Sequence, residues 1–478
     1  MDYLTVGFDL DLTLVDSRAG IAAVADALSA ESGVPIDTPA IVDSIGSPLS
    51  EELSRWFPPD RVSWAADRFR ILYPELAVPR STLLPGAAEA VAAVRRLGGR
   101  PVVVSAKYEP NVRATLEHVG LDVDEVVGSR YGGDKGTALR EYRTSVYVGD
   151  HRGDIEAARA AGAVGVGVAT GRLDAAALRS AGADVALADL TEFPGWLDEH
   201  VLNARLAALD ARLVGLGDAL VAFSGGADSA FVLAEAINLL GAEHVVAATA
   251  VSPSLAAAEL DDAAAFAAEY GVRHVTPRTE EMRREGYRAN AGDRCYFCKA
   301  ELMDVLGPLA VELRLTTIAT GTNADDVRGG FRPGIRAADE RGAVTPLADA
   351  GLTKAQVREA SRRRGLRTWD KPAAACLSSR LRYGIEVTPG RLARVERAEA
   401  ALRMALEDAG IWADNLRVRD LGGRARVEVD ALVAASVADC SPALAAVRSA
   451  GFDAVEVDPR GFRSGSMNEL LPDPARYR

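Results

Sequence analysis

Two carboxylates follow the first apolar segment of the chain. Asp9 and Asp11 lie in the sequence Asp9-Leu10-Asp11-Leu12-Thr13, directly after Leu4–Phe8. A carboxylate at the end of a buried strand can attack phosphorus and form an aspartyl phosphate. A second carboxylate two residues further on can protonate the leaving oxygen. The pair predicts phosphoryl chemistry, and the structural alternative is that both residues are solvated turn residues.

Other polar residues along the first part of the chain complete this pattern. Asp150 and Asp154 follow another apolar segment and, with Asp9 and Asp11, offer carboxylates to Mg²⁺. Ser105 ends a third apolar segment, and Lys135 is expected in a loop, where its ammonium could neutralise a bound phosphate.

A glycine-rich turn opens a second set of residues. Ser224-Gly225-Gly226-Ala227-Asp228-Ser229 stands between a predicted strand and a predicted helix. Glycines let the backbone approach an oxyanion, and the first N–H groups of the following helix can bind it. There is no Gly-Lys-Ser/Thr, so this is not a Walker loop. The pattern predicts binding of an oxyanion, and a glycine-rich turn without function is the alternative.

Three more motifs follow the glycine-rich turn. Cys295 and Cys298 form a CxxC, Gly321-Thr322-Asn323 follows a predicted strand, and Cys376 lies among small residues in Asp370–Arg380. Three cysteines can hold a [4Fe–4S] cluster. A zinc site or three reduced thiols are the alternatives, although zinc would normally need a fourth protein ligand. Cys440, in an alanine-rich helical stretch, is expected to be ordinary packing.

Apolar segments and amphipathic stretches alternate along the chain and must position these motifs. We predict strands at Leu4–Phe8, Pro101–Val104, Ser145–Val148, Ala163–Val168, Ala219–Phe223, Val245–Ala250 and Thr317–Thr320, with helices such as Glu89–Leu97 and Asp154–Ala161 between them. Strands alternating with helices predict the α/β class, with two doubly wound parallel-sheet domains. Short strands at Arg417–Asp420 and Arg424–Asp430 predict a small C-terminal α+β subdomain.

Three domains are expected from this organisation. The first covers 1–195, with a helical cap at about 17–83, the second covers 196–385, and the third covers 386–478. The pattern breaks near Leu190–Glu199, where Phe193-Pro194-Gly195 interrupts it, and a helix is predicted from His200 to Val214.

Composition excludes several functional classes. The 478 residues carry a formal net charge of -13, which repels phosphate backbones and makes nucleic acid an improbable partner. Four cysteines do not form a disulfide framework and fit a reducing compartment. The first residues lack the pattern of a signal peptide, and no apolar run reaches the roughly 18 residues of a membrane span. We expect a cytoplasmic protein without a membrane partner.

The first set of motifs resembles the haloacid dehalogenase (HAD) superfamily of phosphohydrolases over roughly residues 1–195. The resemblance implies that Asp9 is the nucleophile, Asp11 the general acid and base, and Ser105 and Lys135 phosphate ligands. It also implies that Asp150 and Asp154 are part of the Mg²⁺ site. Leu12 departs from the family pattern, because many members carry glycine there.

The second set resembles the PP-loop enzymes that split ATP into AMP and pyrophosphate, and within them the LarE-type sulfur transferases over about residues 200–470. The blocks that carry this resemblance are the glycine-rich turn, the CxxC, the segment around Cys376 and the closing segment Gly461–Asn468. It implies adenylation of a carboxylate of pyridinium-3,5-biscarboxylic acid mononucleotide and its conversion to a thiocarboxylate, a step in nickel-pincer nucleotide biosynthesis. It also implies ATP bound by Ser224, Gly225, Gly226, Asp228, Ser229, Gly321, Thr322 and Asn323.

The resemblance also assigns roles around the sulfur chemistry. Cys376 corresponds to the sulfur-bearing cysteine of the family. Members with one such cysteine give up its sulfur, whereas members with three hold a [4Fe–4S] cluster, and Cys295, Cys298 and Cys376 fit the second pattern. Both sulfur sources stay open at this stage.

Charged residues near the last cysteine are candidates for substrate binding. Arg380, Arg417 and Arg419 could bind the phosphate and carboxylates of the substrate, because guanidinium groups match both. Solvated surface pairs are the alternative for each arginine. Glu399 is a candidate metal-binding residue. We expect a small-molecule nucleotide substrate and a homo-oligomer.

One other function remains open. A transfer-RNA thiolase also joins a PP-loop to three cysteines and a cluster, and the HAD part would then be a non-catalytic docking module. The substrate of the HAD part cannot be read from the sequence.

Overall fold

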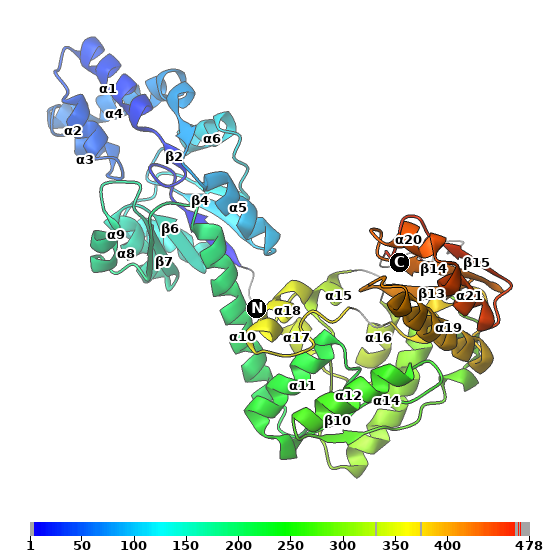
Figure 1. The fold of residues 1–478 in the computed structure, drawn as a ribbon. Coiled ribbons are helices and arrows are strands. Elements are labelled where there is room, and N and C mark those ends of the chain that lie inside the picture. Colours follow the sequence, from blue (N-terminus) through cyan, green and yellow to red (C-terminus); the bar gives the residue numbers. More distant parts are fainter. Residues whose placement is uncertain (1–3, 330–331, 373–374, 464–466, 468, 470–478) are drawn as a thin grey trace. The chain divides into compact units, whose positions relative to one another are not determined.

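The computed structural model of the chain describes residues 4–329, 332–372, 375–463, 467 and 469, which form two compact units, Met1–Val201 and Leu202–Arg478 (Figure 1). Two predicted segments lie partly outside the described residues. These are the segment before Cys376, at positions 373–374, and most of positions 464–468 in the closing motif.

A six-stranded parallel sheet forms the centre of the first unit. Its order is β5 (Glu125–Val127), β4 (Arg100–Val104), β1 (Thr5–Phe8), β6 (Val146–Gly149), β7 (Val164–Val168) and β8 (Val185–Leu187). The connecting helices are α5 (Ala87–Arg96), α6 (Glu109–His118), α7 (Gly133–Glu141), α8 (Arg152–Ala161) and α9 (Ala175–Ser180).

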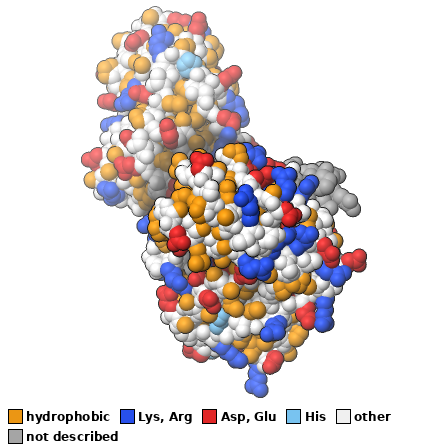
Figure 2. Space-filling view, turned by 45° about the vertical axis from the view of Figure 1, so that its right-hand side comes forward, with side chains coloured by type: hydrophobic (Ala, Val, Ile, Leu, Met, Phe, Trp, Pro, Cys, Tyr) orange, Lys and Arg blue, Asp and Glu red, His pale blue; other side chains and the backbone are white. Residues whose placement is uncertain are grey.

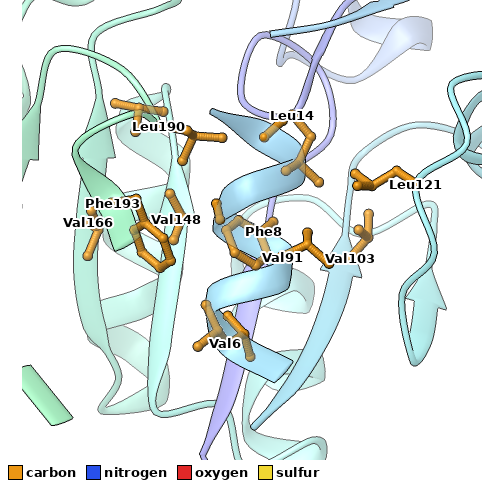
Figure 3. Close-up of a cluster of buried hydrophobic side chains, with 14 of the residues drawn as sticks. Val6, Phe8, Leu14, Val91, Val103, Leu121, Val148, Val166, Leu190 and Phe193 are labelled. Atoms are coloured by element: carbon orange, nitrogen blue, oxygen red, sulfur yellow. The ribbon is translucent and has the colours of Figure 1, made fainter. Parts of the chain in front are cut away.

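Both faces of this sheet are buried. On one face Val91 of α5 lies against Phe8 and Val103 of neighbouring strands (Figure 3). On the other face Val102 and Tyr147 belong to a second apolar cluster. Strands buried on both faces are nearly continuously apolar, which is why short apolar runs predicted them correctly.

The range expected as a cap holds four helices, α1 (Arg18–Ser32), α2 (Thr38–Asp43), α3 (Leu49–Leu53) and α4 (Pro59–Leu76). The chain enters it through β2 (Val15–Asp16) and leaves it through β3 (Thr82–Leu83), and these two strands pair antiparallel. A 3₁₀ turn, η1 (Val78–Arg80), follows α4. Leu28 and Phe69 belong to an apolar cluster formed mainly by these helices, with Val78 of η1 added and Ala114 of α6 packed against it, so this part has its own small core.

The second unit contains a four-stranded parallel sheet. Its order is β11 (Arg273–Val275), β10 (Val245–Ala248), β9 (Ala219–Ala222) and β12 (Thr317–Thr320). Helices α11 (Ala227–Leu240), α12 (Ala257–Glu269), α13 (Glu285–Arg288), α14 (Arg294–Glu312), α15 (Ala324–Arg328), α16 (Pro333–Asp339), α17 (Pro346–Asp349) and α18 (Lys354–Arg363) accompany it, with 3₁₀ turns η2 (Ala242–His244), η3 (Glu281–Arg283) and η4 (Leu377–Arg380).

The end of the chain forms a separate α+β layer within this unit. Helix α19 (Pro389–Asp408) packs with β13 (Leu416–Asp420), β14 (Arg424–Val429), α20 (Ala434–Asp439), α21 (Ser441–Ser449) and β15 (Ala454–Val457). Strand β14 pairs with β13 antiparallel and with β15 parallel. The predicted fold class, two parallel α/β sheets and a small α+β part, is confirmed.

Helix α10 (Phe193–Val214) corrects one prediction. We expected Phe193-Pro194-Gly195 to interrupt the pattern and the helix to begin at His200, but these three residues form its first turn. The first N–H groups of a helix have no intrahelical partner, so proline is tolerated there. Phe193 is fully buried and packs edge-on against Phe8, with ring centroids 5.5 Å apart.

The surface carries both signs of charge. Acidic, basic and hydrophobic side chains are interspersed on the face drawn in Figure 2, although the net charge is -13. In the part of the chain that the structure describes, no helix combines the length and the apolar character needed to cross a membrane.

The N-terminus of α5 provides a stability test. Gly86 has φ +82°, and a Cβ placed there would lie 2.3 Å from the backbone of Leu190 and Thr191. Gly33 has φ +68° with nothing within 4 Å of such a Cβ. Gly33→Ala should cost about 1 kcal/mol of backbone strain, whereas Gly86→Ala should cost roughly 1–3 kcal/mol more because of the overlap. Calorimetry of the full chain would measure both, and equal shifts of the first unit's transition would contradict the packing.

Candidate active sites

The strand order of the first sheet gathers the predicted phosphoryl-transfer residues. Strand β1 lies between β4 and β6, so the chain leaves β1 at the point where the strand order reverses, which is where open α/β sheets bind ligands. Asp9 follows β1, Ser105 follows β4, and Asp150 follows β6. All three side chains are at least nine-tenths buried.

A tight turn aims the two N-terminal carboxylates. Leu12 has φ +57°, and its N–H donates to the carbonyl oxygen of Val15 over 2.8 Å. The left-handed backbone region is adopted mostly by glycine, so the backbone of Leu12 has a conformation that few other residues adopt. The turn places Ser17 Oγ 2.5 Å from Asp11 Oδ1 and Thr13 Oγ1 3.2 Å from Asp150 Oδ1.

Lys135 connects two of the carboxylates. Its Nζ donates to Asp9 Oδ1 over 3.0 Å and to Asp154 Oδ1 over 2.6 Å. We expected Lys135 in a loop, but it lies in the first turn of α7. Burial favours the neutral amine, yet the carboxylates of Asp154 and Asp9 hold the pKa of Lys135 well above its usual value. The side chain is therefore a fixed positive charge at the site.

Three carboxylates form a group suited to a metal ion. One oxygen each of Asp9, Asp150 and Asp154 lies within 4.8 Å of the other two. Burial raises the pKa of Asp9 to about 7 and that of Asp150 well above its usual value. Clustered buried carboxylates of this kind fit a small hard cation such as Mg²⁺. Asp11, which we also expected among the metal ligands, does not belong to this group.

Lys107 is a site residue that the sequence prediction missed. Its Nζ donates to Asp11 Oδ1 over 2.6 Å and to the hydroxyl of Tyr73 on α4. Burial opposes its charge, but the Asp11 carboxylate raises the pKa of Lys107 above its usual value. The signal was a lysine two residues after Ser105, and its pairing with Tyr73 depends on the fold of a distant helix.

A cavity of about 260 Å³ opens over these residues. Asp9, Asp11, Ser105 and Lys135 line it from the core, and residues of α1 to α4 line it from the cap. The predicted phosphate ligands therefore face the same space as the predicted nucleophile.

The glycine-rich turn of the second unit lies at the reversal point of the second sheet. Strand β9 stands between β10 and β12, and the turn connects β9 to α11. Gly225 has φ +71°, a conformation that glycine adopts without strain. Ser229 Oγ donates to the carbonyl oxygen of Gly226 over 3.1 Å and accepts from Ser224 N–H over 3.3 Å, so the two serines close the turn on itself.

The loop after β12 packs onto this turn. A Cβ on Gly321 would lie 2.6 Å from the backbone nitrogen of Ser229, so the two backbones are in contact. Thr322 follows, and Asn323 caps α15 by accepting from the N–H groups of Asp325 and Asp326. The structure thus brings together residues predicted to bind ATP from two separate loops.

The carboxylate of Asp228, at the start of α11, is buried in an energetically unfavourable position. Its Oδ1 is buried and has no hydrogen-bond partner among the described residues. Burial raises the pKa of Asp228, and the ammonium of Lys354 opposes that rise. A buried carboxylate oxygen without a hydrogen bond is unfavourable unless something else binds it.

The three cysteines lie near one another in the second unit. Cys295 and Cys298 stand in the first turns of α14, and Cys376 directly precedes η4. Partial burial, followed by the proximity of the Cys376 thiol, raises the pKa of Cys298. Among the described residues, only the aspartate group of the first unit has all its ligand atoms within 4.8 Å of one another, so at least one pair of the three thiols is more than 4.8 Å apart.

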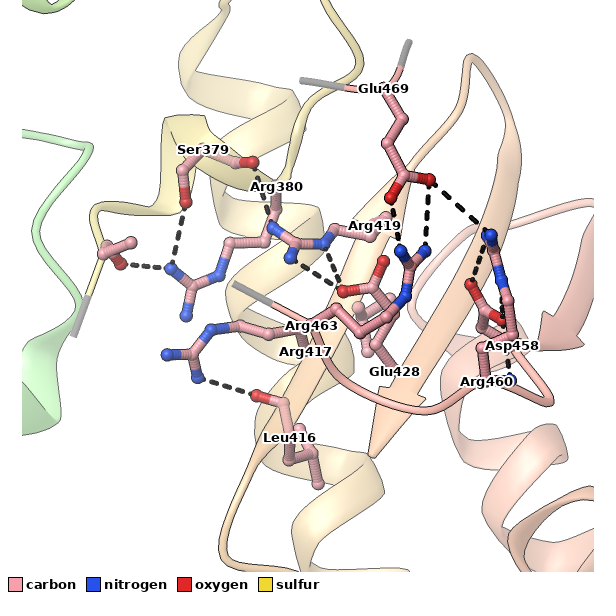
Figure 4. Close-up of polar contacts among 12 residues, drawn as sticks. Ser379, Arg380, Leu416, Arg417, Arg419, Glu428, Asp458, Arg460, Arg463 and Glu469 are labelled. Carbon is pink, nitrogen blue, oxygen red and sulfur yellow. Dashed lines mark hydrogen bonds and ion pairs between the residues drawn. The ribbon is translucent and has the colours of Figure 1, made fainter. Parts of the chain in front are cut away.

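The predicted arginines lie on η4 and β13. Arg417 donates to the carbonyl oxygen of Leu416, and Arg419 contacts the carboxylate of Glu428 (Figure 4). Arg380 donates to both oxygens of Glu399 over 3.0 and 3.2 Å, and Arg419 donates to Glu428 over 2.7 and 3.0 Å. Burial, and after it the positive charge of Arg380, lowers the pKa of Arg417 to about 10. Glu399, a predicted metal ligand, is instead placed as the partner of Arg380 and of the Val418 N–H.

Tyr287 is a second residue that the sequence did not indicate. It is fully buried in the apolar cluster that also contains Leu377 and Cys298. Its hydroxyl has no hydrogen-bond partner of good geometry within the described ranges. A tyrosine in a short helical segment gives no sequence signal of such a position.

Comparison with known proteins assigns both units. A family profile for haloacid dehalogenase-like hydrolases matches residues 6–159, and a related HAD-hydrolase-like profile matches residues 135–193. A phosphoglycolate phosphatase of Pectobacterium atrosepticum is 29% identical over 221 residues, which cover 41% of this chain and 94% of the phosphatase.

Two relatives match the C-terminal region. An uncharacterized protein of Synechocystis is 42% identical over 274 residues, covering 57% of this chain and 99% of that protein. The pyridinium-3,5-bisthiocarboxylic acid mononucleotide synthase of Lactiplantibacillus plantarum is 32% identical over 271 residues, covering 56% of this chain and 96% of the synthase. The chain therefore belongs, through its C-terminal region, to the LarE family of that synthase, and it carries a haloacid dehalogenase-like hydrolase domain at its N-terminus.

Proposed function

We propose that the chain is an enzyme with two activities. The second unit uses ATP to convert a carboxylate of pyridinium-3,5-biscarboxylic acid mononucleotide into a thiocarboxylate. The first unit is a Mg²⁺-dependent phosphatase. The observation that carries the proposal is the likeness to the synthase over 96% of its length, in a unit where a glycine-rich turn follows a central parallel strand.

The second unit activates its substrate by adenylation. An oxygen of the substrate carboxylate attacks the α-phosphorus of ATP, and the bond from that phosphorus to pyrophosphate breaks. The turn from Ser224 to Ser229, with Gly321, Thr322 and Asn323, holds the nucleotide, since its N–H and hydroxyl groups suit phosphate oxygens. A sulfur nucleophile then attacks the acyl carbon, and AMP leaves with the bonding electrons. Arg380, Arg417 and Arg419 bind the phosphate and carboxylates of the substrate.

The thiols of Cys295, Cys298 and Cys376 hold a [4Fe–4S] cluster. The Cys376 thiol lies close enough to Cys298 to add to the effect of burial on its pKa, and at least one pair of the three thiols is more than 4.8 Å apart. This spacing supports three ligands to different irons. When bound, such a cluster would offer one iron without a protein ligand, to which sulfide can bind. Within the chain, Arg294 lies beside these thiols, where the charges of Cys376 and Cys295 offset the effect of burial and raise its pKa.

The first unit transfers a phosphoryl group to its own carboxylate. An Asp9 oxygen attacks phosphorus, the bond to the leaving alcohol breaks, and Asp11 gives that alcohol its proton. Water then opens the aspartyl phosphate and releases inorganic phosphate. Mg²⁺ held by Asp9, Asp150 and Asp154 would neutralise phosphate oxygens. Ser105, Lys135 and Lys107 line the cavity and bind the phosphate. Lys107 also holds Asp11 in place through its hydrogen bond to that carboxylate.

The setting of the enzyme is part of the proposal. The net charge of -13 supports a small-molecule nucleotide rather than a nucleic acid as substrate. The four free cysteines support a reducing, cytoplasmic location, and no membrane partner is proposed. Exposed apolar side chains at Met404, Trp412 and Leu432 support a homo-oligomer.

Substitutions in the glycine-rich turn test the use of ATP. Asp228→Ala and Ser229→Ala should abolish formation of AMP, pyrophosphate and thiocarboxylate, because they remove a carboxylate and a hydroxyl from the nucleotide loop. Phosphatase turnover of the full chain should not change. Asp261→Ala, an exposed carboxylate on α12, is the control. Loss of both activities in one variant would contradict two independent sites.

The nucleophile of the first unit is tested by a change of similar shape. Asp9→Asn should lower Mg²⁺-dependent hydrolysis of p-nitrophenyl phosphate by a factor of about 10³ or more, since the amide cannot attack phosphorus. Asp60→Asn, an exposed residue of α4, should keep the wild-type rate. Wild-type protein without phosphatase activity at any Mg²⁺ concentration would leave this unit a docking module.

Iron content tests the cysteine assignment. Anaerobically reconstituted protein should hold about four irons per chain. Serine in place of Cys295, Cys298 or Cys376 should lower iron content and thiocarboxylate formation together, whereas Cys440→Ser should change neither. A loss of about 34 Da from the Cys376 peptide after turnover, the mass of H₂S, would show instead that this cysteine gives up its own sulfur.

A further inference from the structure

A buried glutamate lies on the cap side of the cavity in the first unit. Glu52 is in α3, and only 5% of it is exposed. It lines the same cavity as the nucleophile Asp9. No step of the proposed phosphatase reaction uses it, and no motif in the sequence pointed to it.

The protein offers few partners to the buried negative charge of the Glu52 carboxylate. Arg55 Nη1 lies 3.0 Å from Glu52 Oε2, but the Arg55 side chain is 54% exposed. This contact lacks hydrogen-bond geometry, and Oε2 has no hydrogen-bond partner in the described part of the chain. Burying a carboxylate with one exposed ion-pair partner is unfavourable, so a ligand that pairs with it would relieve the cost.

The two ends of the cavity differ in character. The core end carries the cations Lys107 and Lys135 beside the reacting carboxylates, so it suits the phosphate group. The cap side combines apolar residues such as Ile41 and Phe69 with serine hydroxyls, and Glu52 is its carboxylate.

One cation also lines the cap. Arg70 Nη1 pairs with Asp67 over 2.9 Å, and its guanidinium lies 5.5 Å from the ring centre of Tyr108. The Arg70 guanidinium is therefore already paired with the Asp67 carboxylate and stacked near the Tyr108 ring. Glu52 is therefore the charge that a leaving group meets when its phosphate is at the core end.

We propose that the first unit hydrolyses phosphate monoesters of small alcohols that carry a protonated amine, and that Glu52 binds this ammonium group. The proposal rests on the proposed phosphatase function and adds its substrate class. A carboxylate in the leaving group would face Glu52 as a like charge, so esters of hydroxy acids should be poor substrates. The cavity of about 260 Å³ limits the leaving group to a small one.

The reaction follows the phosphatase steps without a further reactant. The bond between an Asp9 oxygen and phosphorus forms as the bond to the amino alcohol breaks, and the proton of Asp11 goes to the alcohol oxygen. Water then cleaves the aspartyl phosphate. The ammonium group keeps its proton throughout and binds to Glu52.

Three esters of similar size test the substrate class. O-Phosphoethanolamine, 2-hydroxyethyl phosphate and 2-phosphoglycolate carry an ammonium, a hydroxyl and a carboxylate at the same distance from phosphorus. With the full chain and Mg²⁺, kcat/KM should fall in that order, by at least about tenfold from first to last, as expected for a charge-assisted hydrogen bond. Equal values, or the highest value for 2-phosphoglycolate, would overturn the proposal.

A variant pair assigns the effect to one side chain. Glu52→Gln removes the charge and keeps the shape, so the preference for the amine over the carboxylate should shrink about tenfold, mainly through KM. Glu51→Gln alters the exposed neighbour on the same helix and should keep the wild-type preference. An unchanged preference in Glu52→Gln protein with a wild-type unfolding temperature would overturn the role of Glu52.

p-Nitrophenyl phosphate separates this inference from the function on which it rests. Hydrolysis of this ester with no hydrolysis of O-phosphoethanolamine would overturn the substrate class and leave the phosphatase function standing. No hydrolysis of any of the four esters would overturn both.

Discussion

The site in the first unit depends on burying several charges where apolar strands end. Strand β1 is fully buried, and the next residue is the carboxylate of Asp9. A carboxylate in such a place is stable only when cations and donors surround it. Lys135 serves Asp9 and Asp154, and Lys107 serves Asp11. The lysines thus hold the carboxylates in place and add the positive charge that a phosphate needs.

The glycine-rich turn of the second unit provides groups for an anion with fewer charged side chains. The turn uses glycine backbone, two serine hydroxyls and the N-terminus of α11, and Gly321 allows the neighbouring loop to touch that helix. The charged groups lie instead on η4 and β13, where Arg380 and Arg419 each hold a glutamate. A substrate anion that binds there has to compete with Glu399 and Glu428, which favours binding of several anionic groups at once.

Local patterns in the sequence predicted the strands and most of the site. Each buried parallel strand is a short apolar run, so the residues at its carboxyl end, such as Asp9, Ser105 and Ser224, could be identified before the fold was known. Lys107 and Glu52 could not be, because the residues that line the cavity with them lie far away in the sequence. The predicted start of α10 was wrong. A proline such as Pro194 is typical of the end of a helix when only the local sequence is considered, but it also suits the first turn of a helix.

Helix α10 has a consequence for how such a chain can be divided. Leu197 and Val201 belong to the apolar core of the first unit, whereas Leu202 and Leu209 belong to that of the second. The two units therefore share one helix rather than a dispensable linker. A gene split between Val201 and Leu202 would leave each half its own apolar core residues but would create two new helix ends inside α10. The N–H and C=O groups at those ends would lose their intrahelical partners, so each half would need a new helix cap.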